Sequence, residues 1–356
     1  MDPAVIEEAD ALASFRTALA HRDRPVRVSW FGDSLTADDH MTHALRTALA
    51  GDHGDGGPGF MFAAPPHPFC QHRACRRTDS DEWTVHGIAG FVPPDKLLGL
   101  GGSAETDRGG TIELVPASPV ASVDVHYLAA PHAGSFELFA DRTSIARVDT
   151  AADTKASKFA RADVPEGTKR LTLRAPGRLR LFGMTLEAKT GTVVDNLGIV
   201  NATAKAMHDH DRDDHLRVQL AHRAPDLVIA MYGANEAEWL APNGSGMAEH
   251  EQKLTAVLQA FRATGAACLV ISPLDQIDWR DPKQPPRASI PAMVEAQHRA
   301  ARAAGCAFWN AYTWMGGKGS SMSWLRRGLL VHDFQHPTSE GAVIIATALF
   351  GAVTKL

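Results

Sequence analysis

The 356-residue sequence lacks the features that mark several classes of protein. No apolar run approaches the roughly 20 residues that cross a bilayer, and the acidic, helical pattern of the first 20 residues is not that of a signal peptide. No long run of Lys or Arg occurs, and the formal net charge is −5, so we expect neither nucleic acid nor anionic lipid as a partner. A small ester or a neutral glycan is the better expectation for a substrate.

Cysteine is scarce, with four residues in the whole chain. None of them forms a CxxC pair or shows zinc-finger spacing, which argues against a structural metal site. Cys268 and Cys306 lie in apolar runs, and we expect both in the core. Cys70 and Cys75 lie close together in a polar loop, where they could bridge in an oxidising compartment, although two free thiols are the simpler interpretation.

What is present is a chain long enough for two domains, with 44% hydrophobic residues. Residues 4–20 show helical spacing, and the apolar run RPVRVSWF after them predicts a buried strand. The strand leads into a turn at Gly32-Asp33-Ser34, and residues 36–49 are again helical in pattern. Residues 51–68 are rich in Gly and Pro and predict an irregular loop.

The pattern changes between about residues 84 and 190. About six short segments there alternate polar and apolar residues, as strands with one buried face do, and no helical segment separates them. Beyond them, DLVIAMYG and AACLVISP are strands expected to be buried on both faces, with helices at 247–263 and 289–304. The expected organisation is an α/β unit, residues 1–83 and 191–356, interrupted by an antiparallel β-sandwich, residues 84–190.

Four short blocks carry chemistry-bearing residues. They are Phe31-Gly32-Asp33-Ser34-Leu35, Asp195-Asn196-Leu197-Gly198, Gly233-Ala234-Asn235-Glu236 and Asp333-Phe334-Gln335-His336. Their types and order resemble those of the SGNH/GDSL serine hydrolases, and all four together make coincidence improbable. The resemblance implies a flavodoxin-like three-layer α/β fold and needs no cofactor.

A serine hydroxyl is a weak nucleophile, so it requires a neighbouring base whose ring is oriented by a third group. The resemblance gives these roles to Ser34, His336 and Asp333. It also implies an oxyanion hole made of the Ser34 and Gly198 N–H groups and the Asn235 side chain, each donor worth ~10²–10³ in turnover. The plainer alternatives are that Gly32-Asp33-Ser34 is only a capped turn, and that Gly198 serves backbone conformation.

A narrower resemblance concerns the bacterial peptidoglycan O-acetylesterases. The segment from the first block to the Gly-Gly-Pro-Gly-Phe run at 56–60 is similar to theirs, and they carry a β-sandwich, similar to a carbohydrate-binding module, between the first two blocks. The sequence departs from that branch at Leu35, where histidine is common, and at Asn201-Ala202, where a glycine is expected. Because of these departures, the resemblance does not specify which glycan is the substrate.

The leading hypothesis is therefore a serine esterase that removes O-acetyl groups from a glycan, with peptidoglycan as a candidate. A general carboxylesterase, another polysaccharide deacetylase and an O-acetyltransferase with the same triad are alternatives. A non-catalytic glycan-binding protein is least favoured, because the triad is intact. An enzyme that acts on the cell wall would be periplasmic or secreted, with a leader removed; otherwise we expect a cytoplasmic location.

Two other groups of residues attract attention. The run from His208 to His215, HDHDRDDH, has metal-ligand residue types, but they point to several faces of a predicted helix, so a solvated acidic surface is the expected role and no metal is predicted. Several tryptophans could stack on sugar rings, although burial is the simpler expectation for each; they are Trp239, Trp279, Trp309, Trp314 and Trp324.

Overall fold

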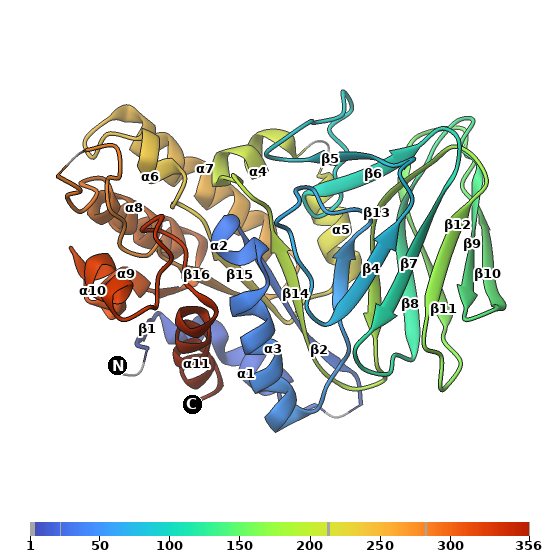
Figure 1. Cartoon of the computed structure of the whole chain (residues 1–356), viewed down its shortest axis with the longest axis horizontal. Helices are drawn as coiled ribbons and strands as arrows, with labels where there is room; N and C mark the ends of the chain where they lie inside the picture. Colours follow the sequence, from blue (N-terminus) through green and yellow to red (C-terminus); the bar gives the residue numbers. More distant parts are fainter. Residues whose placement is uncertain (1–3, 22, 212–213, 282, 356) are drawn as a thin grey trace.

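The computed structural model describes residues 4–21, 23–211, 214–281 and 283–355 (Figure 1). One part of the molecule is built on a six-stranded sheet in the order β1-β17-β16-β15-β2-β14. The strands are β1 (Ile6–Glu7), β2 (Pro25–Gly32), β14 (Gly191–Gly198), β15 (Leu227–Met231), β16 (Ala267–Ile271) and β17 (Ala307–Trp309). All neighbours pair in parallel except β1. Starting from β14, the parallel strands follow the chain order 2-1-3-4-5, the flavodoxin-like arrangement.

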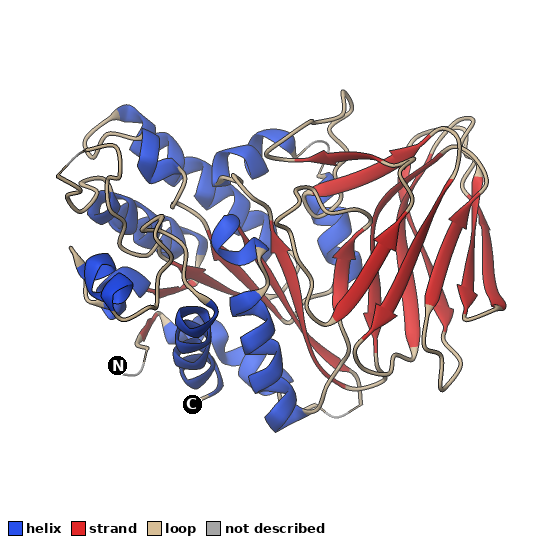
Figure 2. Ribbon diagram, in the orientation of Figure 1, coloured by secondary structure: helices blue, strands red, loops and turns tan. Residues whose placement is uncertain are grey.

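Helices cover both faces of this sheet (Figure 2). One face is covered by η1 (Ala9–Leu12), α1 (Ala13–Ala18), α3 (His40–His53) and α11 (Ser339–Thr354), and the other by α4 (Ala204–His210), α5 (His215–Arg223), α7 (Ser245–Arg262) and α8 (Ile290–Ala304). The shorter helices α2 (Ser34–Ala37), α6 (Glu236–Trp239), α9 (Ala311–Met315) and α10 (Ser320–Arg326) lie in the connections. None of the described helices is long and apolar enough to cross a membrane.

The apolar runs of the sequence explain this layering. In β15, Leu227, Ile229 and Met231 belong to the core beside α3 and α11, whereas Val228 and Ala230 belong to the core beside α7 and α8. Successive side chains of a strand point to opposite faces, so a strand covered on both sides must be apolar at every position. The expectation of an α/β fold with buried parallel strands is confirmed.

Two antiparallel sheets form the other part of the molecule, at the right in Figure 1. One has the order β10-β9-β12-β7-β4 and the other β11-β8-β13-β6-β5, with β3 also paired to β13. The strands are β3 (Gly59–Phe62), β4 (Cys75–Asp79), β5 (Thr84–Gly87), β6 (Gly102–Thr106), β7 (Gly110–Pro116), β8 (Ser122–Ala129), β9 (Ser135–Ala140), β10 (Thr143–Asp149), β11 (Ala156–Asp163), β12 (Leu171–Ala175) and β13 (Leu179–Glu187). Side chains from both sheets share a core of their own, which includes Ile112, Phe136 and Leu181.

Three local expectations were wrong. The Gly- and Pro-rich segment 51–68 is not wholly irregular, because β3 lies in it and pairs with β13. Residues 4–20 do not form one helix: β1 pairs with β17, a 3₁₀ turn follows, and Val5 is exposed. The helix expected over 36–49 is divided into α2 and α3, because Asp39 adopts a left-handed backbone conformation with φ of 59°.

A buried ion-pair network joins the antiparallel strands to the parallel sheet. Arg223, at the end of α5, binds Asp195 of β14 through two nitrogens at 2.8 Å and Glu187 of β13 at 2.6 Å. Asp195 also accepts the hydroxyl of Ser29 in β2 and the N–H of Phe60 in β3. Burial alone would raise the pKa of Glu187, but the charges and hydrogen bonds of Arg223 and Arg27 lower it to about 2.

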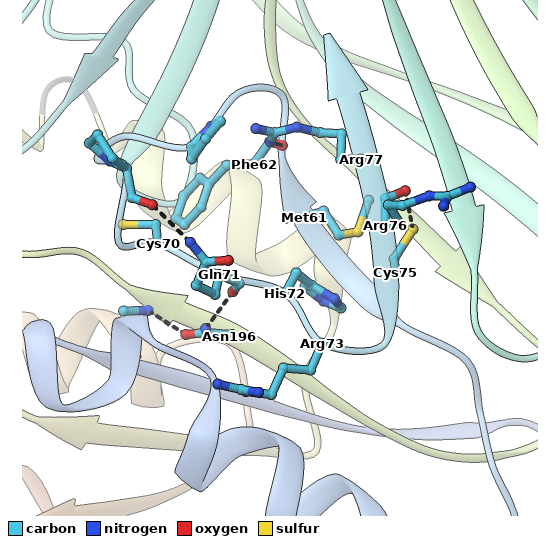
Figure 3. A pocket seen from close by; sticks show the side chains of 13 residues that line it. Met61, Phe62, Cys70, Gln71, His72, Arg73, Cys75, Arg76, Arg77 and Asn196 are labelled. Atoms are coloured by element: carbon cyan, nitrogen blue, oxygen red, sulfur yellow. Dashed lines mark hydrogen bonds between the residues drawn. The ribbon is translucent and has the colours of Figure 1, made fainter. Parts of the chain in front are cut away.

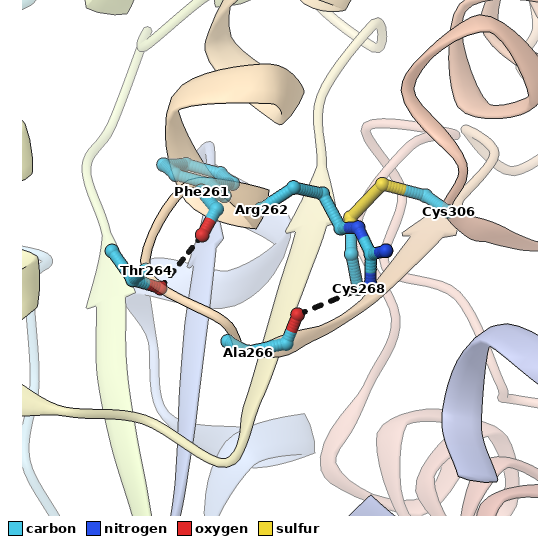
Figure 4. The surroundings of a disulfide bond; sticks show 6 residues. All are labelled: Phe261, Arg262, Thr264, Ala266, Cys268 and Cys306. Carbon is cyan, nitrogen blue, oxygen red and sulfur yellow. Dashed lines mark hydrogen bonds between the residues drawn. A yellow bond between two sulfur atoms is a disulfide. The ribbon is translucent and has the colours of Figure 1, made fainter. Parts of the chain in front are cut away.

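The two core cysteines form a disulfide. Cys268 at the start of β16 is bonded to Cys306 just before β17 (Figure 4). Burial of both was expected and is confirmed, but the bond was not predicted, because their separation of 38 residues gives no sign that β16 and β17 are neighbours. Cys70 and Cys75 are free thiols, as the simpler interpretation had it.

Replacing Cys268 and Cys306 together with alanine should lower the free energy of unfolding by about 2–4 kcal/mol, because the bond closes a loop that an unfolded chain would otherwise leave open. Urea denaturation of the double variant measures this. Cys70→Ala, which breaks no bond, is the matched control and should change stability much less. Equal losses in the two proteins would contradict a stabilising bond.

Candidate active site

Ser34 lies where β2 meets α2, at the carboxyl edge of the parallel sheet. It is the first residue of α2, and the preceding Asp33 caps that helix by accepting the N–H of Leu35 at 2.9 Å. Asp33 is fully buried, and burial raises its pKa to about 7. Asp33 thus holds the turn that presents Ser34.

His336 connects Ser34 to Asp333. Its Nε2 lies 2.7 Å from Ser34 Oγ, and its Nδ1 lies 2.7 Å from Asp333 Oδ2. The second oxygen of Asp333 accepts the N–H groups of Gln335 and His336, both at 2.9 Å. The Asp333 carboxylate therefore closes the turn with one oxygen and contacts the His336 ring with the other. This is how an acid only three positions before the histidine can orient its imidazole.

The charge of Asp333 makes the His336 imidazole more basic. Burial alone would lower the pKa of His336, but the hydrogen bond and the negative charge of Asp333 outweigh it, and the pKa lies above its ordinary value. Burial would likewise raise the pKa of Asp333, but the hydrogen bonds from His336 and the turn lower it. An ionised Asp333 beside a ring that readily accepts a proton is the arrangement that activates a serine hydroxyl.

Gly198 is the last residue of β14, and Asn235 follows β15; these two strands lie on either side of β2 in the sheet. One hydrogen of the Asn235 side-chain amide is donated to the carbonyl of Ala202 at 3.0 Å. The N–H of Gly198 is donated to Asn196 Oδ1, also at 3.0 Å. A Cβ on Gly198 would come within 2.4 Å of the Ala37 nitrogen, so close approach to α2 also requires a glycine there.

Two residues of the blocks have roles that the sequence did not suggest. The buried carboxylate of Glu236 accepts the N–H groups of Gly233 and Ala204, which ties the loop after β15 to the start of α4. Asn196 donates its amide to the carbonyls of Ala37 and Gln71 at 3.2 and 3.1 Å. Their place inside the blocks, beside Asn235 and Gly198, was the only signal in the sequence.

A pocket of about 410 Å³ adjoins this region (Figure 3). Asn196 and Gly198 line it on the side of the parallel sheet, and Met61, Phe62 and the segment 65–77 line the rest. Three of its residues are basic: Arg73, Arg76 and Arg77. Arg77 is paired with Asp79 at 2.9 Å, whereas Arg76 is exposed on β4. The pocket thus offers positive charge and apolar surface close to Gly198, at the end of β14.

The residues that departed from the expected pattern lie differently. Leu35 is buried in the core beside α3 and α11, so it does not face solvent at the site. Asn201 adopts a left-handed conformation with φ of 64°, one that glycine adopts more readily, and Ala202 is buried and accepts Asn235.

The run from His208 to His215 is divided by Arg212 and Asp213, which lie outside the described residues. His215 is buried and accepts the N–H of Gly99 at 2.8 Å, while Asp209 binds Lys205 and Lys253 on the surface. Among the described residues of the run, no three ligand atoms come together as a metal site requires.

The tryptophans fall into two groups. Trp309 and Trp324 are buried and Trp314 packs against them, as expected. Trp239 and Trp279 are exposed, and the Arg280 guanidinium lies over both rings at 4.4 and 5.4 Å. Burial was therefore the wrong expectation for these two.

The chain is similar to a known protein family and to several solved structures. The model of the GDSL-like lipase/acylhydrolase family matches residues 167–344, half of the chain. Among solved structures, the chain is similar to a peptidoglycan O-acetylesterase, with 23% identity, a TM-score of 0.79 and coverage of 96% of this chain and 94% of that one. An acetyl xylan esterase matches with 18% identity and a TM-score of 0.35, covering 46% of this chain and 81% of its own. No curated protein sequence gives a significant match.

Ser34 should be the residue that reacts with a fluorophosphonate probe, and Ser34→Ala should abolish labelling without loss of fold. His336→Ala should slow labelling by roughly 10³-fold or more, because the hydroxyl then has no base. Mass spectrometry of the labelled peptide measures both. Ser339→Ala, a change at a neighbouring exposed serine, is the control and should label normally; equal labelling of wild type and His336→Ala would remove His336 from the role of base.

The pH profile should report His336. Since the base must be neutral, kcat/KM should fall as the pH drops through the raised pKa of His336. Asp333→Asn removes the charge that raises this pKa, so the acidic limb should move to lower pH while kcat falls by roughly 10³–10⁴. Measuring kcat/KM for ester hydrolysis from about pH 5 to 9 covers this acidic limb. An unmoved limb in Asp333→Asn would show that another group titrates.

Proposed function

Because the chain belongs to the GDSL-like lipase/acylhydrolase family, and is accordingly an ester-hydrolysing enzyme, we propose that it removes O-acetyl groups from a glycan and that this glycan is peptidoglycan. The observation that carries the proposal is the pair of 2.7 Å contacts that links Ser34, His336 and Asp333. The likeness to a solved peptidoglycan O-acetylesterase over nearly the full length of both chains supports the choice of glycan.

In the proposed reaction, Ser34 Oγ gives its proton to His336 Nε2 and attacks the acetyl carbonyl. The bond between the carbonyl carbon and the sugar oxygen then breaks, and His336 returns the proton to that oxygen, which leaves as a hydroxyl group. Asp333 stays ionised and stabilises the imidazolium. Water next gives a proton to His336 and attacks the carbonyl carbon of the acetyl-Ser34 ester. The bond between that carbon and Ser34 Oγ breaks, His336 returns the proton to Oγ, and acetic acid leaves and ionises to acetate.

The negative oxygen formed in both steps requires donors. The N–H of Ser34 is at the first position of α2, where no intrahelical acceptor exists. Asn235 keeps a second amide hydrogen beyond the one given to Ala202. We propose both as donors, together with Gly198, whose N–H must leave Asn196 Oδ1 before it can serve.

The pocket beside Gly198 fits a glycan that carries acidic groups. Peptidoglycan bears carboxylates on its peptides, and guanidinium groups bind carboxylates well. Arg76 and Arg73 are both exposed at this pocket. We propose that they hold the polymer while its acetyl group reaches Ser34.

We further propose the division of the chain into a catalytic unit, residues 1–83 and 191–356, and an inserted β-sandwich, residues 84–190, similar to a carbohydrate-binding module. A separate apolar core between the two antiparallel sheets supports it. The strands β3 and β4 pair into these sheets although they precede residue 84, so the wall of the pocket is continuous with the sandwich. The sandwich would then orient the polymer.

Acetate release from O-acetylated peptidoglycan, compared with acetylated xylan and with p-nitrophenyl acetate, tests the substrate. We expect kcat/KM to be highest on peptidoglycan. Arg76→Gln should lower kcat/KM on peptidoglycan by about tenfold and leave p-nitrophenyl acetate unchanged, because so small a substrate does not reach the arginine. Arg147→Gln, an exposed arginine on β10, is the matched control.

A preference for acetylated xylan would overturn the choice of peptidoglycan while keeping the esterase. An equal effect of Arg76→Gln on the large and the small substrate would show that Arg76 supports the fold rather than the polymer.

A further inference from the structure

A second pocket, of about 270 Å³, lies between α5 and the antiparallel sheet that contains β11, β8 and β13. It is lined by Asp124 and His126 of β8 and by His222 of α5, among others. Asp124 and His126 are two positions apart on one strand, so their side chains project from the same face. One ring nitrogen of each histidine and one oxygen of Asp124 lie within 4.8 Å of one another.

The polar atoms of this group are incompletely satisfied. His126 is fully buried; its Nδ1 lies 2.9 Å from Gln219 Oε1, and its Nε2 has no hydrogen-bond partner. Because a carbonyl oxygen only accepts, Nδ1 carries the hydrogen and Nε2 presents a lone pair. Oδ1 of Asp124 is also buried without a partner. Buried polar atoms without a partner, such as His126 Nε2 and Asp124 Oδ1, lower the stability of the fold. A bound ligand would supply the missing partner.

The surroundings hold both rings in place. His222 stacks on Phe159 with 3.5 Å between ring centroids, and its Nε2 lies 2.6 Å from Asp124 Oδ2. His126 meets the rings of Phe60 and Phe159 edge to face. A histidine whose second nitrogen is bound to a carbonyl oxygen, as His126 is to Gln219, is the usual form of a metal-ligating imidazole.

The arginines at the pocket do not exclude a cation. Arg223 and Arg27 are both paired with Glu187, and Arg223 also with Asp195. Arg161, on the outer side, donates to Ser122 Oγ. The carboxylates of Glu187 and Asp195 offset the charges of Arg27 and Arg223, and the exposed Arg161 is the remaining cation at this pocket. Asp124 is left to face the two imidazoles.

We propose that Asp124, His126 and His222 bind a divalent transition-metal ion, with Zn²⁺ as the best match. Two imidazoles and one carboxylate are a frequent zinc ligand set, and solvent at the exposed His222 side would complete four-coordination. Such an ion would join β8 to α5, and so the antiparallel sheets to the parallel part of the molecule. The ion would lie apart from Ser34, because Arg27, at the same pocket, precedes Gly32 by five residues of β2, about 17 Å along the strand, and Ser34 lies beyond Gly32.

The test uses the whole chain after treatment with EDTA and dialysis. Titration with Zn²⁺ in a calorimeter should show one tight equivalent, and Co²⁺ in its place should give the intense visible absorption of a four-coordinate site. Excess Zn²⁺ should raise the thermal midpoint by about 3–5 °C. Hydrolysis of p-nitrophenyl acetate should not change, which separates this proposal from that of the esterase.

Two variants probe the ligands. His222→Gln, at the exposed side, and Asp124→Asn, which keeps a hydrogen bond to His222, should each weaken Zn²⁺ binding by about tenfold or more and abolish the thermal shift. The control is His298→Gln, because His298, Glu7 and Glu8 form the other such group among the described residues. It should retain the tight equivalent. No tight equivalent in the wild type, or unchanged affinity in both ligand variants, would overturn the proposal.

Discussion

The buried guanidinium group of Arg223 is the interaction on which the two parts of this molecule depend. It satisfies Asp195 and Glu187 at once, and Asp195 in turn fixes Ser29 of β2 and the backbone of β3. A buried charge is tolerated only when it is paired and hydrogen-bonded, so removing any member would leave an uncompensated charge in the interior. Helix α5, the parallel sheet and the first antiparallel strand are therefore positioned together.

This constraint has a consequence for the candidate active site. Asp195 and Ser29 lie on β14 and β2, whose carboxyl ends carry Gly198 and Ser34. Asn235 follows β15, on the other side of β2. In an open parallel sheet, the point where the strand order reverses leaves a crevice at the carboxyl ends, and here that point lies between β2 and β15. The strand order itself thus brings the serine and the proposed oxyanion donors to one edge.

Asp333 and His336 reach the same edge by a shorter route. Because one turn holds both residues, the chain needs a single long-range approach, between His336 and Ser34, to complete the group. The antiparallel sheets meet the parallel sheet at two pockets, one at the carboxyl edge near Gly198 and one toward the other end of β2. The same packing of sheets can therefore serve substrate contact at one end and attachment at the other.

The sequence by itself determined the elements and residues whose signal is local. Continuous apolar runs predicted β2, β15 and β16 because a strand covered on both faces exposes no polar position, and the four blocks pointed to Ser34, Asp333 and His336. Period-two alternation predicted about six of the antiparallel strands, whereas the structure has nine, β5 to β13, between residues 84 and 190. It missed β3 and β4, whose short segments lie among Gly and Pro or charged residues.

Tertiary structure alone decided which distant residues meet. It joined Cys268 to Cys306, brought His222 to Asp124 and His126, and gave the Gly198 N–H to Asn196. Periodicity reports which face of a segment is buried, but not which segment covers it. That choice is made by the order of strands in the sheets and by buried groups such as Arg223, which must find their partners wherever the chain places them.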